Sequence, residues 1–400
     1  MDAERSEKVI DPSSGSNQTR VRAYNERLVL SLIRRHGSLP KSEIARRTGL
    51  SAQTASVIMR SLEADGLLLR GEPQRGKVGQ PSIPMSLNPD GVFSIGLKIG
   101  RRSAELLLVD FIGQQRKALH IQYQYPLFAE ILYFAQTGIR KLASSLTDEQ
   151  CGSIAGIGVA MPFELWSWAE KIGAPEEQMR DWQILDFKQE LQALCQYPVF
   201  VQNDATAACG AELIFGRGSG LTDFIYLFIG TFVGGGVVLN HALYSGRTGN
   251  AGAFGPMPVL LADGVTAPLI DHASILILEN RLKQNKADFS VAELRLDQWD
   301  ALGEPLTDWI GETARHLAVA IVAACSVIDF EAAIIDGDFP ADVRQRIVAA
   351  IKVAIREIDL RGVVSPEIHP GEVGRIARAL GAASLPLSSK YLLDQSVLFK

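Results

Sequence analysis

The sequence predicts an α/β fold, with a small helical head followed by a larger body in two lobes. Three observations lead to this prediction. A chain of 400 residues is longer than one hydrophobic core usually supports. Positive charge gathers near the start of the chain. Beyond residue 92, short apolar runs typical of strands alternate with segments that have helical spacing, which indicates an α/β body.

Composition narrows the class of protein. Apolar residues make up 47% of the chain and charged residues 21%, as in ordinary soluble globular proteins. The four cysteines are far apart, so we expect buried thiols rather than disulfides or a zinc site, and we expect no metal and no cofactor. The first 20 residues are polar, and no apolar run approaches the roughly 20 residues of a membrane span. We therefore expect a cytoplasmic protein with no membrane partner.

Charge is distributed unevenly along the chain. Residues 20–80 contain 12 Lys or Arg and 5 Asp or Glu, an excess of seven positive charges. The whole chain carries a net charge of -5, so the remaining residues sum to -12. A basic head on an acidic body indicates a module for nucleic acid joined to a different kind of domain.

The head has the pattern of three helices. Apolar residues at helical spacing over residues 25–36 predict an amphipathic helix that ends at Gly37. A short helix is expected over Ser42–Thr48 and another over Ala52–Ala64, joined by a turn at Gly49. Their packing faces are expected to contain five apolar residues: Ile44, Ala45, Val57, Ile58 and Leu62.

Two helices joined by a glycine turn form a helix-turn-helix, and the second helix then carries the outward polar side chains that can contact bases and phosphates. Ser51 is the expected N-cap of that helix. Residues 66–87 predict a strand, a basic loop and a returning strand, which together form a wing. The alternative is a helical adaptor with a solvated basic face. Eight residues are expected to contact DNA: Ser42, Ser51, Gln53, Thr54, Ser56, Arg60, Lys77 and Gln80.

A linker is expected at Asn88–Gly91, after which the character of the chain changes. The apolar segments then predict strand pairs around turns, short buried strands, and a late apolar helix that leads into another strand. That helix, Leu317–Ile328, is expected either to help an oligomer interface or to be buried in the core. The predicted domains are a winged helix-turn-helix over 20–87, a first lobe over 92–205 and a second lobe over 206–390.

Three segments of the sequence together resemble a known family. The head "LVLSLIRRHGSLPKSEIARRTGLS", the wing tip "GKVGQPS" and the acidic motif "VQNDATAACGAE" together resemble the winged-helix repressor branch of the ROK family of repressors, open reading frames and sugar kinases. The resemblance extends from about Asn25 to Gly381. It implies an actin-like, hexokinase-like (ribonuclease H-like) body with a cleft between two lobes.

The resemblance allows a test for phosphoryl transfer, which needs magnesium, positioned phosphates and a base. Where kinases of the family have an Asp, two glycines and a Thr, this chain has Lys98, Gly100, Arg101 and Arg102. An ammonium repels the metal, and a large side chain blocks the close approach that glycine permits. The alternatives are that these cations bind an acidic ligand, or that Lys98 pairs with Asp204.

Two further motifs depart from the kinase pattern. Phe232 stands in the second glycine-rich turn where the family usually has another glycine, although such a turn can also simply shape a hairpin. At the nucleotide side, Asp336 and Asp338 would place negative charge near a bound nucleotide. The usual Glu and His of a following motif are replaced by Ala253 and Pro256, and the zinc loop is absent. We therefore expect no catalytic residues.

The sugar side is better preserved. Asn203 and Asp204 match the pair that contacts sugar hydroxyls in the kinases, and we interpret Asp204 as a ligand contact, with a helix N-cap as the alternative or additional role. Glu164 and Trp166 follow a strand end, where clefts in α/β folds collect ligands. Each tryptophan of this segment, Trp166 or Trp168, can equally be core or interface filler. Trp182 is expected to be structural.

These observations predict a DNA-binding transcriptional regulator, a repressor of carbohydrate metabolism or transport genes, whose body senses a sugar-like effector. Its expected partners are a double-stranded DNA operator, the effector, and further copies of itself in a homodimer or homotetramer. One alternative is a sugar kinase with a DNA-binding head. Another is a body that binds no ligand and only brings two heads together.

Overall fold

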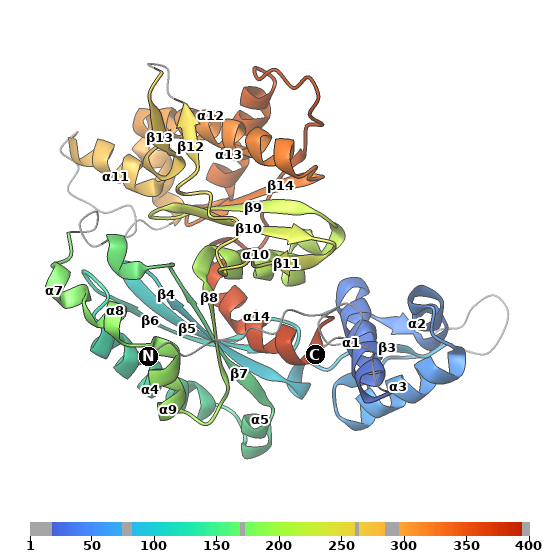
Figure 1. Ribbon diagram of the computed structural model, residues 1–400. Coiled ribbons are helices and arrows are strands. Elements are labelled where there is room, and N and C mark those ends of the chain that lie inside the picture. The colour runs from blue at the N-terminus through green and yellow to red at the C-terminus, as the bar shows by residue number, and fades with distance from the viewer. Residues whose placement is uncertain (1–17, 74–81, 169–172, 261–263, 285–295, 394–400) are drawn as a thin grey trace, which may run out of the picture.

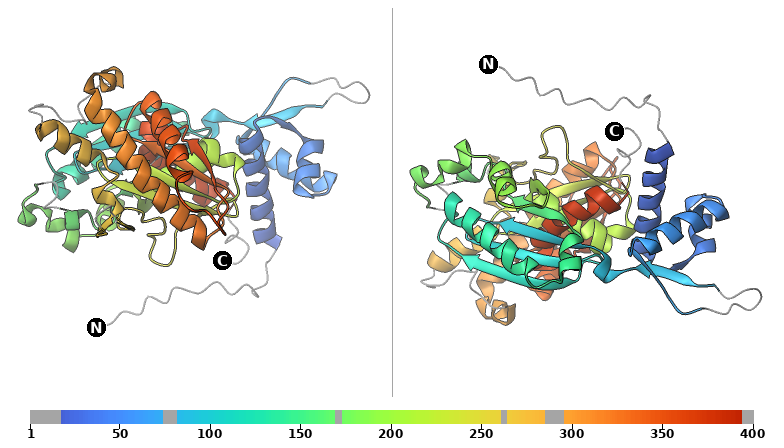
Figure 2. Two further views of the ribbon diagram at one scale, coloured as in Figure 1. Left: turned by 90° about the horizontal axis from the view of Figure 1, so that it is seen from above. Right: turned by 90° about the horizontal axis from the view of Figure 1, so that it is seen from below.

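The computed structural model describes residues 18–73, 82–168, 173–260, 264–284 and 296–393. Within these residues a small head stands beside a body in two lobes, each built around a five-stranded sheet (Figure 1). Figure 2 shows the head at one end of the body in both further views. The predicted α/β fold, with a winged head and a two-lobed body, is confirmed.

The head folds as the sequence predicts. Its elements are α1 (Gln18–His36), β1 (Leu39–Pro40), α2 (Lys41–Thr48), α3 (Ala52–Ala64), β2 (Leu68–Arg70) and β3 (Pro84–Leu87). The three strands form a sheet in the order β1-β3-β2. Gly49 ends α2 with a φ of 72°, a left-handed conformation that glycine adopts without steric cost. Ile44, Ile58 and Leu62 are buried as expected, and Ala45 is half-buried.

The first lobe contains a mixed sheet in the order β6-β5-β4-β7-β8. Its strands are β4 (Phe93–Ile99), β5 (Ser103–Asp110), β6 (Gln115–Gln122), β7 (Ile154–Met161) and β8 (Val199–Asn203). Its helices are α4 (Phe128–Ala143), α5 (Asp148–Gly152), α7 (Glu176–Met179), α8 (Asp181–Ile184) and α9 (Phe187–Leu194). Trp182 is 4% exposed and donates to the Pro126 carbonyl at 2.8 Å, so its predicted structural role is confirmed.

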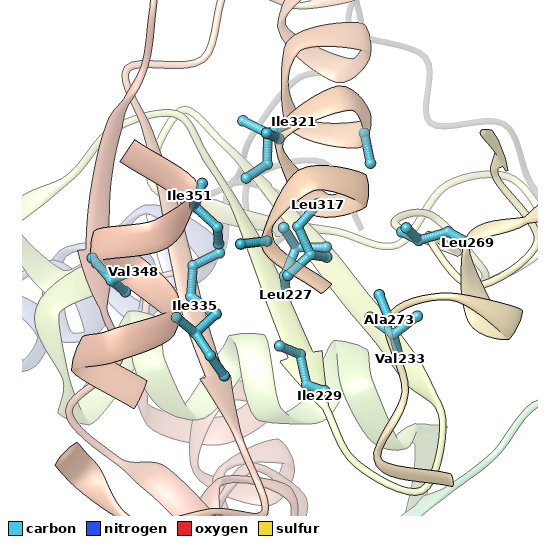
Figure 3. Close-up of a cluster of buried hydrophobic side chains, with 14 of the residues drawn as sticks. Leu227, Ile229, Val233, Leu269, Ala273, Leu317, Ile321, Ile335, Val348 and Ile351 are labelled. Atoms are coloured by element: carbon cyan, nitrogen blue, oxygen red, sulfur yellow. The ribbon is translucent and has the colours of Figure 1, made fainter. Parts of the chain in front are cut away.

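The second lobe contains a sheet in the order β11-β10-β9-β14-β15. Its strands are β9 (Phe224–Ile229), β10 (Val233–Leu239), β11 (Ala242–Tyr244), β14 (Ala332–Gly337) and β15 (Glu367–Pro370), with a separate pair β12 (Pro258–Leu260) and β13 (Thr266–Pro268). The remaining helices are α10 (Asp204–Phe215), α11 (Ile275–Gln284), α12 (Glu304–Val327), α13 (Ala341–Ile355) and α14 (Ala377–Tyr391). Figure 3 shows apolar side chains between this sheet and α12 and α13, including Leu227, Leu317 and Ile335.

Helix α12 has the length and hydropathy that a membrane-spanning helix also has, although no membrane span was expected from the sequence. Its inner face, including Leu317 and Ile321, is buried in the core of the second lobe. Core burial therefore accounts for that face of the helix. Val319 and Val327 on other faces are 41% and 83% exposed.

Helix α14 lies between the two lobes and the head. It packs against β4 and β7 of the first sheet and against α10, although it falls within the range 206–390 predicted for the second lobe. The approach is very close, because a Cβ atom added to Gly158 would lie 1.7 Å from the Ala382 oxygen. A Cβ atom added to Gly381 would lie 1.9 Å from the Ala207 oxygen. Only glycine fits at these two positions.

The linker joins the head to the body firmly. The Asn88 side chain donates to the Gly66 carbonyl at 2.7 Å, and its backbone amide donates to Leu67 at 2.9 Å. Arg34 of α1 donates to the Phe111 carbonyl at 2.5 Å and lies over the Phe111 ring. The head and the body also share one apolar cluster. The segment is therefore a packed junction and not a free tether.

The cysteines differ in part from expectation. Cys209 and Cys325 are buried, but Cys151 and Cys195 are only half-buried. All four are free thiols. Cys151 lies in the short helix α5 and Cys195 is the C-cap of α9, so sequence spacing alone does not reveal their exposure.

We predict that Gly158→Ala lowers the apparent free energy of unfolding by about 2 kcal/mol or more, because the new methyl group overlaps the backbone of α14. Gly311→Ala in α12 is the control, since a Cβ atom there meets nothing within 4 Å and alanine favours a helix. Urea unfolding followed by circular dichroism measures both. Equal stability of Gly158→Ala and the wild type would contradict the close packing.

Candidate functional site

The outward face of α3 carries polar side chains that were predicted to contact DNA. Gln53, Thr54 and Arg60 are exposed, and Ser56 is half-buried. Ser51 caps the helix as expected, because its Oγ accepts a hydrogen bond from the Thr54 amide at 3.1 Å. These side chains therefore stand on a well-defined helix that is open to a partner.

The prediction that Val57 packs inside the head is wrong. Its side chain is 48% exposed, whereas Ile58, Met59 and Leu62 are buried. An α-helix turns by about 100° per residue, so Ile58 and Leu62 face inward together while Val57 lies on the side of Gln53. An exposed valine on this face can contact the methyl group of a thymine.

The other predicted DNA contacts lie around the wing and α2. Ser42 is exposed in the first turn of α2. The wing strands β2 and β3 pair in antiparallel register, with Arg70 opposite Met85. Lys77 and Gln80, predicted at the wing tip, lie outside the described residues.

Several cations of the head are paired with carboxylates. Arg46 and Arg47 both bond to Glu43, at 2.6 and 2.5 Å. Arg70 pairs with Glu63. Such exposed pairs add little stability. Glu43 and Glu63 are already counted in the excess of seven positive charges, so these pairs leave the net charge of the head unchanged.

The turn between β4 and β5 lies where the family resemblance places one wall of the cleft between the lobes. Lys98 is 8% exposed, and its Nζ donates to Ser103 Oγ at 2.8 Å. Burial, and after it the neighbouring Arg378, lowers the pKa of Lys98 to about 8. Within the described part of the chain, no carboxylate oxygen lies within 4 Å of this ammonium. The alternative that Lys98 forms an ion pair with Asp204 is therefore wrong for this structure.

The same turn contacts the second lobe directly. The Arg101 guanidinium lies 4.2 Å from the centre of the Phe232 ring, in the turn between β9 and β10. Arg102 pairs with the buried Glu279 of α11 at 3.5 Å. Burial lowers the pKa of Arg101 to about 10. The two turns that would hold phosphates in a kinase are thus in contact with each other.

Asn203 and Asp204 stand where β8 meets α10. The N-cap of α10 is Asn203, whose Oδ1 accepts from the amides of Ala205 at 3.1 Å and Thr206 at 3.2 Å. The alternative role of Asp204 as the cap is therefore wrong, since Asp204 is the first helical residue. Its Oδ1 accepts from the Ala205 amide at 3.0 Å, and its Oδ2 faces Arg378 at 3.5 Å.

The acidic residues at the nucleotide side are ion-paired, which differs from the open negative charge that the sequence predicts. Asp338 bonds to Arg378 at 2.5 Å. Asp336 is fully buried and lies 3.2 Å from Arg344. Burial raises the pKa of Asp336, while Arg344 opposes that effect. The carboxylates of Asp336 and Asp338 are therefore each paired with an arginine on this side of the cleft.

The remaining predicted ligand contacts, Glu164 and Trp166, follow the end of β7. Met161, the last residue of β7, pairs with Asn203, the last residue of β8. The segment with Glu164 and Trp166 and the segment with Asn203 and Asp204 therefore lie at the ends of adjacent strands. Glu164 is exposed and has a φ of 48°, which is unusual for a residue with a side chain. Trp166 is half-buried, with part of its side chain packed against the core of the first lobe and part accessible.

Ala253 and Pro256 line an apolar cavity of about 440 Å³ in the second lobe. Phe254, Val327 and Ile328 also contribute to its walls. Neither Ala253 nor Pro256 offers a side-chain partner for a sugar hydroxyl. The cavity itself is lined mainly by apolar side chains.

Arg378 is a functional candidate that the sequence did not reveal. It bridges Asp204 and Asp338, and its guanidinium lies 4.7 Å from the centre of the Phe228 ring. The one signal in the sequence is its neighbourhood, because "ARALGAAS" places a single cation among small residues on a buried helix. A charge in such a setting is rarely buried without partners.

We predict that Lys98→Met stabilises the protein by roughly 2 to 3 kcal/mol at pH 7, because it removes a buried ammonium. The pKa of about 8 lies below the usual 10.5, so between these values the unfolded chain binds more protons. Wild-type stability therefore rises with pH across this window, and the advantage of the variant fades by about pH 10.5.

Urea unfolding of both proteins at pH 7 and pH 10 measures this difference. Lys141→Met, at an exposed position of α4, is the matched control and should leave stability nearly unchanged at both values. An advantage for Lys98→Met that is the same at both pH values would exclude a desolvated ammonium as its cause.

Comparisons with known proteins agree with this architecture. The ROK family model matches residues 94–388, and a model of a winged helix-turn-helix DNA-binding domain matches residues 22–68. The xylose repressor of Bacillus subtilis is 25% identical over 249 residues, which cover 61% of this chain and 62% of the repressor. The alignment with that relative thus spans less than two thirds of its length.

Two solved structures share the fold. One is a ROK-family transcriptional regulator, a homologue of the Escherichia coli Mlc protein, with a TM-score of 0.67 and 20% identity over 95% of this chain and 99% of that one. The other is a ROK-family glucokinase from Streptomyces griseus in complex with glucose and AMPPNP, with a TM-score of 0.57 and 22% identity over 73% and 98%. Since the family model covers well over half of the chain, this protein belongs to the ROK family and carries a winged helix-turn-helix at its head.

Proposed function

We propose that this protein is a cytoplasmic, sequence-specific transcriptional regulator that represses genes of carbohydrate metabolism or transport in response to a sugar-like effector. The observation that carries the proposal is the contact between the two phosphate turns. Arg101 covers Phe232 where a nucleotide would need open backbone, while the winged head keeps an exposed recognition face. The sugar-related role is supported by the similarity to a xylose repressor.

The charge pattern of the cleft favours a binding protein over a kinase. Phosphoryl transfer requires a magnesium ion beside the phosphates. Lys98 puts a buried positive charge at the position where the kinase pattern has a carboxylate. A general base at Asp204 contributes about 10² to 10⁴ in rate and cannot replace the metal site. We therefore propose that the body is not an enzyme.

We propose that α3 enters the major groove of an operator. Gln53 and Thr54 are placed to contact base edges, Val57 a thymine methyl group, and Arg60 a phosphate. Five further residues are proposed to contact the DNA backbone or the adjacent groove: Ser42 and Ser51 at helix starts, Ser56, and Lys77 and Gln80 of the wing. A homodimer or homotetramer would present two such heads to a near-palindromic site.

The effector site is proposed to include Asn203, Asp204, Glu164 and Trp166. The carboxylates of Asp204 and Glu164 can accept hydrogen bonds from hydroxyl groups. The half-buried Trp166 would offer a ring edge or face to the apolar side of a sugar. No metal and no nucleotide enter this proposal.

Gln53→Ala tests base recognition. We expect roughly tenfold weaker binding to an operator selected from random duplexes, with unchanged binding to random DNA, because a contact to a base edge is worth about 1–3 kcal/mol. Arg60→Ala is the matched variant on the same exposed face. It should weaken both kinds of DNA similarly and reduce the salt slope by about 0.9.

Fluorescence anisotropy at two salt concentrations measures both effects. Circular dichroism of each variant checks that the head remains folded. If Gln53→Ala loses equal affinity for selected and random DNA, Gln53 does not recognise a base.

A second test separates sensing from catalysis. We expect no sugar-dependent ADP formation from magnesium-ATP, and a rise in melting temperature with at least one sugar, polyol or sugar phosphate. Asp204→Asn should reduce that rise, because an amide accepts hydroxyl hydrogen bonds less strongly than a carboxylate. Turnover that Asp204→Asn abolishes would instead identify a sugar kinase. A melting temperature that no compound raises would favour a body that only joins the heads.

A further inference from the structure

Arg378 joins three parts of the cleft. It stands in the first turn of α14, and its side chain is 12% exposed. One guanidinium nitrogen lies 2.5 Å from Asp338, and another lies 3.5 Å from Asp204 at the start of α10. The guanidinium also faces the Phe228 ring of β9. A single side chain thus connects α14 with both lobes.

The two ion pairs differ in quality. The distance to Asp338 is that of a short charge-assisted hydrogen bond, whereas 3.5 Å to Asp204 is at the limit of one. The buried Nε of Arg378 has no acceptor among the described residues. The contact with Asp204 is therefore the loose one. A hydroxyl group could donate to Asp204 and accept from Arg378, which would satisfy both groups better than the direct contact does.

Helix α14 cannot shift independently of the sheet beneath it. Gly96 and Gly158 allow its backbone to lie directly on β4 and β7, and Gly381 does the same toward α10. Closely packed elements move as units and change between discrete arrangements. A displacement at Arg378 would therefore move the whole helix and not a single side chain.

The far end of α14 contacts the head. Leu387 is fully buried in the cluster that contains Val29 and Ile33 of α1. Just after the helix, the Leu393 amide donates to Ser31 Oγ at 2.7 Å. Tyr391 packs edge to face on Phe111, the residue whose carbonyl receives Arg34. The same helix thus begins in the cleft and ends on α1.

Helix α1 in turn supports the recognition helix. The Arg22 guanidinium donates to Ser61 Oγ of α3 at 3.1 Å, and the two helices share the buried core of the head. A tilt of α1 against the body would carry α3 with it. Two heads held in an oligomer would then change their spacing.

We propose that Arg378 is a positioning residue of the effector site, which holds Asp204 while the site is empty and passes the loss of that contact through α14 to the head. This inference rests on the proposed function only in taking Asp204 as the effector contact. A ligand with neighbouring hydroxyl groups would open the contact and favour an arrangement in which α14, together with the sheet beneath it, is displaced from Asp204 and Asp338, because it binds that arrangement better.

The test uses the full chain without any effector. Arg378→Met removes both ion pairs, and Asp204→Asn weakens only the loose one without altering α14. Arg375→Met is the matched control, since Arg375 is an exposed arginine just before the helix. Hydrogen exchange of residues 29–33 and 387–391 reports on the junction, and anisotropy on a DNA duplex selected by the wild type reports on the head.

We expect Asp204→Asn and Arg378→Met to speed exchange at the junction on the order of tenfold and to change DNA affinity at least about fivefold, both in the same direction. The double variant should change affinity no more than Arg378→Met does, because the contact that Asp204→Asn weakens is one of the two that Arg378→Met already removes. Arg375→Met should behave as the wild type, and Arg378→Lys, which keeps one ion pair, should lie between.

Wild-type exchange and DNA affinity in Asp204→Asn, or additive effects in the double variant, would overturn the proposal. If Arg378→Met does not fold, Asp204→Asn and Arg378→Lys decide alone. The outcome is separate from that of the proposed function. A protein that binds sugars but shows no coupling refutes this inference only, whereas coupling in a protein that no sugar stabilises refutes only the sugar effector.

Discussion

The close approach of α14 to the rest of the chain is the constraint on which this structure depends. Glycine at 158 and 381 removes the side chains that would otherwise keep the helix away from β7 and α10. The helix can then fill the space between the lobes and still reach the head. Besides α14, the head contacts the body through the segment at Asn88–Gly91 and through Arg34, which bonds to Phe111. The packing of small residues thus determines which charges meet in the cleft.

Electrostatics then decides what the cleft can do. A kinase of this fold places acidic groups and bare backbone around a metal and phosphates. Here Lys98 is buried and Arg101 is half-buried on one side, and Arg378 and Arg344 neutralise the carboxylates on the other. Each substitution alone could be tolerated in a damaged enzyme. Some of these residues also make contacts between the lobes, such as Arg101 with Phe232, and this agrees with the proposal that the body binds a ligand without catalysis.

Local structure could be predicted from the sequence, and long-range pairing could not. The helix bounds of the head, the Ser51 cap and the role of Trp182 follow from periodicity and residue chemistry within a few positions. Val57 was misplaced because inward and outward faces of a short helix differ by a single residue. Asp204 meets Arg378 across 174 positions, and no local pattern reports such a contact. The family resemblance indicates where Asp204 lies in the fold, but not which side chain pairs with it.

Buried ion pairs of this kind are poor sources of stability, since desolvation offsets most of their attraction. The ion pairs of Arg378 with Asp204 and Asp338 therefore serve something other than stability. A contact that is nearly neutral in free energy can be broken by a ligand of ordinary affinity, whereas a well-packed apolar contact cannot. Placed at the first turn of a helix that moves as a unit, such a contact converts a small chemical change into a change of packing at α1. A receptor needs this combination of a rigid helix and a weak bond more than it needs catalytic groups.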